Sequence, residues 1–197
     1  MKIKFNCLIV LGASLLCACS SGLKEQVTRE DLSLNWQEME QKLQKVSVFS
    51  EQGRIGFISA KDRASCNYEF ILHGDNSSLE LISPIGSQIA YLQVNEDISI
   101  LNYNNTIYKE SDADLLLNRV LGINIPYDEL RKILLGIPSG NISRNKEGKI
   151  ISAVIDGYNV HYVSFKTYNG FTIPADIDIK GYGRNIKLKV NTVNEVK

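Results

Sequence analysis

The sequence predicts a mainly β fold with helices, in which a single curved antiparallel half-barrel sheet of about ten to eleven strands covers three helices. From Phe49 onward, apolar residues recur mostly at every second position, which is typical of strands with one buried face. Short polar turns rich in Gly, Asn and Asp separate these runs, as in an antiparallel meander. Three further segments carry apolar residues at helical spacing, so the sheet and the helices can bury their apolar faces against one another. A closed barrel that holds a ligand would show a similar pattern.

The first helix is expected near Thr28, which forms an approximate capping box with Asp31. Its apolar stripe follows at steps of three or four residues: Leu32, Trp36, Met39, Leu43 and Val46. A second helix is predicted over 112–121, capped by Ser111 with Asp114 and ended by Gly122. A third opens at Pro126 and closes at Gly136 and Pro138.

The expected strands surround these helices. Before them, alternating residues mark strands at Ile55–Phe57, Cys66–Leu72, Leu79–Leu81, Ala90–Val94 and Ile98–Ile100. After them, strands are predicted at 149–155, 159–167, 173–180 and 185–193.

The N-terminus has the pattern of an export signal. Lys2 and Lys4 precede a short apolar stretch that is too short for a comfortable transmembrane helix. The stretch ends in Leu-Cys-Ala-Cys at 16–19, which resembles the lipobox of bacterial lipoproteins, with Cys19 as the lipidated residue. The alternative is an ordinary cleaved signal in which this cysteine has no role. We therefore expect a signal peptide at 1–18, a lipidated N-terminus and tether at 19–30, and one domain at 31–197.

Ser20 follows the lipid-attachment cysteine. In well-studied bacteria an aspartate at this position resembles a signal for retention in the inner membrane. Serine instead favours the outer membrane, so we expect a protein held on the periplasmic face of that membrane through Cys19.

The remaining composition argues against several classes of function. The expected mature chain carries 20 basic and 22 acidic residues, so no basic excess points to nucleic acid. Besides Cys19, it contains one cysteine, Cys66, so it cannot form an internal disulfide. Two histidines, His73 and His161, have no nearby pattern of carboxylates and thiols that would indicate a zinc site, and no serine lies in the Gly-x-Ser-x-Gly elbow of a hydrolase. We expect no cofactor, no metal and no enzyme, but binding by an apolar surface.

Two segments resemble the LolB family of outer-membrane lipoprotein receptors. The first is the run LELISPIGS at 79–87, and the second is 112–138, with LGINIP at 121–126 and LLGIP at 134–138. Supporting matches are Trp36, Gly-Arg-Ile at 53–55, Ile-Pro-Ala at 173–175 and Ile-Lys-Leu-Lys at 186–189. The chain departs from the family pattern at two positions. Ile133 lies where the family commonly has tryptophan, and Ile85 lies where it commonly has leucine.

The resemblance implies a half-open sheet around an apolar cavity and a function without nucleotide or metal. It implies a monomer that accepts client lipoproteins from the periplasmic carrier LolA, holds their acyl chains, and inserts them into outer-membrane lipid. The alternative is a lipoprotein of the same architecture that binds another lipid or amphiphile without lipoprotein transfer.

The residue pattern and the resemblance together suggest two sites. Residues that share one phase on three neighbouring strands are expected on the concave face, as cavity lining or as filled core: Leu79, Leu81, Ala90, Leu92, Val94, Ile98 and Ile100. The second site is the loop Pro84, Ile85 and Gly86, where isoleucine has no role in turn geometry. Ile85 either folds back onto the core or protrudes into a membrane.

Overall fold

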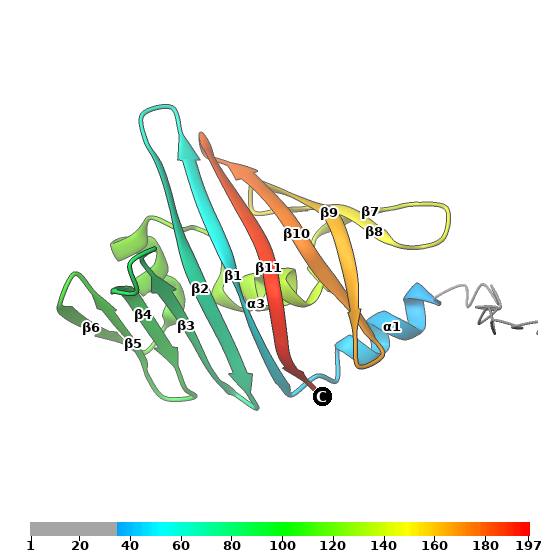
Figure 1. The fold of residues 1–197 in the computed structure, drawn as a ribbon, viewed down its shortest axis with the longest axis horizontal. Helices are drawn as coiled ribbons and strands as arrows, with labels where there is room; N and C mark the ends of the chain where they lie inside the picture. The colour runs from blue at the N-terminus through cyan, green and yellow to red at the C-terminus, as the bar shows by residue number, and fades with distance from the viewer. Residues whose placement is uncertain (1–34) are drawn as a thin grey trace, which may run out of the picture. The chain divides into compact units, whose positions relative to one another are not determined.

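The computed structural model describes residues 35–197, which form one eleven-stranded sheet with helices packed against it (Figure 1). The expected signal peptide, Cys19, the tether and the predicted helix start at Thr28 lie outside the described residues. Within residues 35–197, no helix is both long and apolar enough to cross a membrane.

All neighbouring strands are antiparallel, in the order β6-β5-β4-β3-β2-β1-β11-β10-β9-β8-β7. The first meander comprises β1 (Val48–Ser59), β2 (Arg63–His73), β3 (Asn76–Ile82), β4 (Gln88–Val94), β5 (Ser99–Tyr103) and β6 (Thr106–Glu110). The second comprises β7 (Asn141–Arg144), β8 (Ile150–Ile155), β9 (Tyr158–Tyr168), β10 (Phe171–Gly181) and β11 (Arg184–Val196). The predicted fold class is confirmed. Strands β6 and β7 were not placed by the sequence pattern.

The two meanders meet in the middle of the sheet, where β1 pairs with β11. The chain therefore starts at the centre, moves outward to the edge strand β6, and returns from the other edge strand, β7. The segment between these edges is helical: α2 (Ala113–Leu116), a π-helical turn η1 (Leu117–Leu121) and α3 (Tyr127–Leu135). This helical crossover covers one face of the sheet, which we call the inner face (Figure 1).

Local signals explain where the helices begin and end. Helix α1 (Trp36–Leu43) starts after Asn35, whose side chain accepts a hydrogen bond from the Glu38 amide. Asp112 caps α2, not Ser111 as the sequence suggested, because its carboxylate accepts from the Asp114 amide at 2.8 Å. Gly122 and Gly136 end η1 and α3 in left-handed conformations that glycine adopts without strain.

The antiparallel path places the turns at two opposite ends of the sheet. The turns at 60–62, 83–87, 104–105, 156–157 and 182–183 lie at one end, which we call the Ile85 end. The turns at 74–75, 95–98, 145–148 and 169–170 lie at the opposite end.

Candidate functional site

A small apolar cavity lies between the inner face and the helical crossover. Its volume is about 50 Å³, and apolar atoms line it. The sheet supplies Ile55, Phe57, Tyr68, Leu79, Leu81, Ile179, Ile186 and Leu188. The crossover supplies Leu121, Ile123, Ile125, Leu130 and Leu134.

The cavity is closed to any large ligand in this conformation. One water molecule occupies about 30 Å³ in the liquid, and small-molecule pockets measure about 300–1,000 Å³. A cavity of about 50 Å³ is therefore too small for an acyl chain, and its apolar lining offers no hydrogen-bond partner to water. An acyl chain can enter only if the crossover and the sheet move apart.

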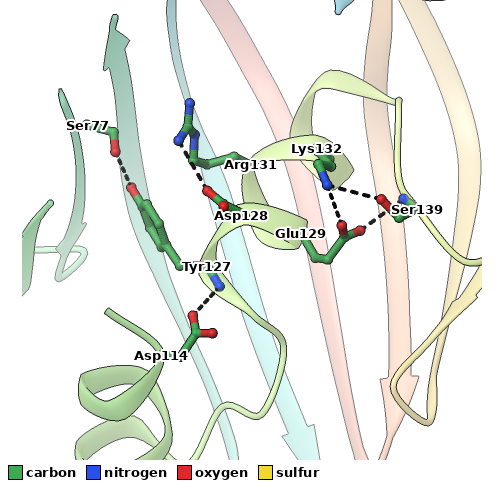
Figure 2. Close-up of polar contacts among 8 residues, drawn as sticks. All are labelled: Ser77, Asp114, Tyr127, Asp128, Glu129, Arg131, Lys132 and Ser139. Carbon is green, nitrogen blue, oxygen red and sulfur yellow. Dashed lines mark hydrogen bonds and ion pairs between the residues drawn. The ribbon is translucent and has the colours of Figure 1, made fainter. Parts of the chain in front are cut away.

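Polar contacts fix the crossover at both ends of α3 (Figure 2). At its start, the Tyr127 amide donates to Asp114 Oδ1 at 2.6 Å, and the Tyr127 hydroxyl donates to Ser77 Oγ on β3 at 2.7 Å. Near its end, the Tyr162 hydroxyl on β9 donates to the Ile133 carbonyl at 3.3 Å. Glu129, in the first turn of α3, accepts from Lys132 Nζ at 2.7 Å and from the Ser139 amide beyond the helix at 2.9 Å. Partial burial opposes ionisation of Glu129, but these hydrogen bonds outweigh it and lower the pKa of the carboxyl.

The loop between η1 and α3 makes two hydrogen bonds to strands of the sheet. Arg184 Nη1 on β11 donates to the Gly122 carbonyl at 2.7 Å. The Asn124 amide donates to the Tyr158 hydroxyl on β9 at 3.3 Å. Because Ile123 and Ile125 in this loop line the cavity, these two contacts hold one cavity wall against the sheet.

A buried acid lies beside the cavity. Glu51 on β1 is 0% exposed, and its Oε1 accepts a hydrogen bond from the Tyr68 hydroxyl at 2.8 Å. Its Oε2 has no hydrogen-bond partner in the described structure. Burial raises the pKa of Glu51 to about 8, against the smaller opposing effect of the Tyr68 hydrogen bond. Glu51 is thus a neutral acid at pH 7, and Tyr68 joins it to the cavity wall.

The structure places the predicted cavity residues in three groups. Leu79 and Leu81 line the cavity. Ala90 and Leu92 are buried on the same face, opposite Leu81 and Leu79 on the neighbouring strand, but they do not line it. Val94 is half-buried, continues the same row and packs against the core.

The prediction is wrong for Ile98 and Ile100. Leu101, not Ile100, lies opposite Leu92, and Ile100 lies opposite Gln93 on the outer face. Ile98 belongs to the β4–β5 turn, where its carbonyl accepts from the Asn95 amide. The inward position near this turn is filled by Ser99, which is fully buried.

Most of the cavity lining was missed because it comes from strands far apart in the sequence. Ile55 and Phe57 on β1 lie opposite Leu188 and Ile186 on β11. Both strands have clean alternation, which predicts an inward face but not that the two strands are neighbours. For Leu130 and Leu134, the apolar helical stripe was the available signal. The irregular segment with Ile123 and Ile125 had no periodicity to indicate burial.

The loop between β3 and β4 presents Ile85 to solvent. The Gly86 amide donates to the Ser83 carbonyl at 2.9 Å, and the Ser87 amide donates to Ser83 Oγ at 3.0 Å. Gly86 has a positive φ of 85°, which completes this tight turn. The Ile85 side chain is 89% exposed, so the alternative that it folds back onto the core is wrong.

Within residues 35–197, no cluster of three His, Cys, Asp or Glu side chains could hold a metal ion. Cys66 is buried, and burial raises the pKa of its thiol.

Comparison with solved structures identifies the fold. The chain superposes on a LolA superfamily protein from Nitrosomonas europaea with a TM-score of 0.53 and 10% identity, covering 80% of this chain and 91% of that one. A putative outer membrane lipoprotein-sorting protein domain from Vibrio parahaemolyticus gives 0.53 at 9% identity, covering 82% and 91%.

Comparison by sequence identifies the family. The outer-membrane lipoprotein LolB of Pectobacterium carotovorum is 27% identical, with 93% of each chain covered. LolB of Aeromonas salmonicida is 25% identical, covering 95% of this chain and 92% of that one. The family model described as outer membrane lipoprotein LolB matches residues 47–192. The chain therefore belongs to the LolB family of outer membrane lipoproteins.

Proposed function

We propose that this chain is an outer-membrane lipoprotein receptor, anchored through Cys19 on the periplasmic face. It accepts lipoproteins from a LolA-type periplasmic carrier, holds their acyl chains against the inner face, and inserts them into the outer membrane. The observation that carries this proposal is the apolar cavity of a LolB-family fold, walled on one side by the helical crossover.

Such a receptor must keep acyl chains out of water, and exposing them costs a large free energy. Each methylene kept from water is worth roughly 0.8 kcal/mol, so one long acyl chain costs on the order of 10 kcal/mol to expose. A receptor must offer an equivalent apolar surface and needs no chemical step. The thirteen side chains that line the closed cavity offer this surface once the crossover separates from the sheet.

Movement of the loop at 122–125 alone breaks few polar contacts. The loop at 122–125 is held to the sheet by the Arg184–Gly122 and Tyr158–Asn124 hydrogen bonds, each worth about 1 kcal/mol net. The acyl chain then replaces the apolar contacts that the crossover loses.

Delivery into a bilayer requires a membrane contact, which we assign to Pro84, Ile85 and Gly86. A protruding isoleucine that enters a bilayer contributes roughly 2 kcal/mol, which orients a protein already tethered by lipid but does not anchor it alone.

A transfer assay with Ile85 variants tests this function. Purified carrier loaded with a radiolabelled lipoprotein is mixed with the receptor, and then with vesicles. We expect Ile85→Glu to accept cargo normally and to deliver it several-fold more slowly, whereas the apolar control Ile85→Leu delivers normally. The charged side chain should not lower the melting temperature, because Ile85 makes no core contact.

Two outcomes would contradict the proposal. If the wild-type chain binds a fluorescent fatty acid but accepts no lipoprotein from the carrier, it is an amphiphile-binding lipoprotein of the same fold. If Ile85→Glu delivers as fast as Ile85→Leu, the loop has no role in insertion.

A further inference from the structure

The Ile85 end of the sheet carries a second exposed isoleucine. Ile107 on the edge strand β6 is 63% exposed and lies two residues after the Asn104–Asn105 turn. Exposed β-branched side chains on an edge strand favour aggregation unless they have a partner. The β3–β4 loop and the β5–β6 turn are at the same end of the first meander, so Ile85 and Ile107 both lie near that end, with Ile107 on the outer face of β6.

The chain around both isoleucines has no charge. Residues 81–95 contain no Asp, Glu, Lys or Arg, and neither do residues 98–108. Both connections can therefore approach a bilayer without taking an ionised side chain out of water.

Charges near these connections differ between the two ends of the first meander. The β1–β2 turn, at the Ile85 end, carries Lys61 and Arg63 against one acid, Asp62, and neither base forms an ion pair with a described residue. At the opposite end, the β2–β3 and β4–β5 turns carry Asp75, Glu96 and Asp97, without lysine or arginine.

We infer that the Ile85 end of the first meander docks on an anionic phospholipid surface, with Ile107 as a second insertion point and Lys61 and Arg63 at the headgroup phosphates. This inference rests on the proposed function, because it extends the membrane contact of the Ile85 loop. The acidic turns at the opposite end of the first meander are repelled by the same surface, so the charges of this meander favour docking through the Ile85 end.

The length of the N-terminal chain permits this orientation. Asn35 precedes Trp36, which lies beside Gly148 in the β7–β8 turn, away from the Ile85 end. The twelve residues of β1 span about 40 Å. The sixteen residue-to-residue steps from Cys19 to Asn35 reach at most about 55 Å when extended. A lipid on Cys19 can therefore lie in the bilayer that the Ile85 end touches.

Vesicle binding by the full mature chain with Cys19→Ala tests the inference, because the substitution removes the lipid anchor. The probes are phosphatidylcholine vesicles with and without phosphatidylglycerol. Ile107→Gln should weaken binding to both vesicles by roughly tenfold. Lys61→Gln with Arg63→Gln should weaken binding about tenfold, and only to vesicles with phosphatidylglycerol. Val163→Gln is the matched control, since Val163 is 57% exposed on β9, in the other meander.

Equal binding by the Ile107→Gln and Val163→Gln variants would overturn the insertion role of Ile107. An unchanged preference for phosphatidylglycerol in the double variant would overturn the role of the basic turn. The transfer assay separates these failures from failure of the proposed function. If Ile85→Glu still slows delivery, receptor function stands without the wider docking surface, and if wild-type protein accepts no cargo, both fall.

Discussion

Two parts of the interior lie along the same face of β1 but are packed differently. Towards the Ile85 end, Ile55 and Phe57 face a void lined by apolar atoms. Towards the start of the strand, Phe49 and Glu51 are completely buried, and the Phe49 ring lies 6.1 Å from that of Phe70. An alternating pattern that looks uniform in the sequence thus contains one hollow region and one filled region.

The boundary between the two regions is at Gly53. A Cβ atom there would lie 2.3 Å from the Lys189 carbonyl oxygen and 2.7 Å from the Tyr68 ring. The missing side chain lets Tyr68 cross over β1, with its ring on the cavity and its hydroxyl on Glu51. The change from hollow to filled packing therefore depends on the pair of Gly53 and Tyr68. Alternation shows which residues point inward, but it does not show this change in packing.

The largest expected effect is a pH dependence that comes from the filled region. Glu51 has its pKa raised from 4.5 to about 8 in the folded protein, so the folded state keeps a proton that the unfolded state releases. Stability contributed by this group is complete below pH 4.5 and falls as pH rises towards 8, by up to about 1.4 kcal/mol per pH unit. Urea unfolding of the wild-type protein and of the Glu51→Gln variant across pH 5–8 measures this loss of stability. The free-energy difference between them should change steadily with pH, and a constant difference would show that Glu51 is ionised in the fold.

A second test compares leucines in the two regions. Leu92 is 2% exposed and lies away from the cavity, so Leu92→Ala leaves a new void and should cost about 3 kcal/mol. Leu79 is half-buried and already faces a void, so Leu79→Ala should cost about 1 kcal/mol. Fatty-acid binding should weaken more in the Leu79 variant. Equal losses of stability and of binding would remove the distinction between the regions.

The smallest effect on stability is expected where volume is added to the void. Ile186→Phe should change the free energy of unfolding by less than about 1 kcal/mol, because the enlarged side chain has space, but should reduce acyl binding. The same substitution at Ile173, which is fully buried and outside the cavity, should cost about 1–3 kcal/mol through overpacking. A larger loss at Ile186 than at Ile173 would show that the cavity is not available in solution.

Alternation predicted the strands well because one face of the sheet is buried along its length. It failed at Ile100 for a reason in tertiary structure. Ser77 and Ser99 lie on the inner face of β3 and β5, opposite Val94 on the strand between them, and Ser77 accepts the Tyr127 hydroxyl. A serine is thus buried where alternation favours an apolar residue, and the isoleucine faces outward.

The helical crossover shows a different limit of prediction. Its residues were predicted to be helical over 112–121, and they form α2 followed by a π-helical turn. A π-helical turn closes i→i+5 hydrogen bonds and is usually a single turn inserted into an α-helix, so apolar spacing over a few residues does not predict it. The cavity wall at Ile123 and Ile125 depends on how this segment lies over the sheet, so a prediction of two helices and a connection could not supply it.

The pairing of β1 with β11 has a consequence for how the molecule acquires its structure. The two central strands are the first and the last of the sheet, so their contacts join residues more than one hundred positions apart. Such non-local pairing closes a long loop and slows folding. Each meander can form hairpins from local contacts, but the seam between them awaits the last thirteen-residue strand. An exported chain would therefore emerge with the two halves of its cavity unjoined, and only arrival of the C-terminal strand would convert two half-sheets into a receptor.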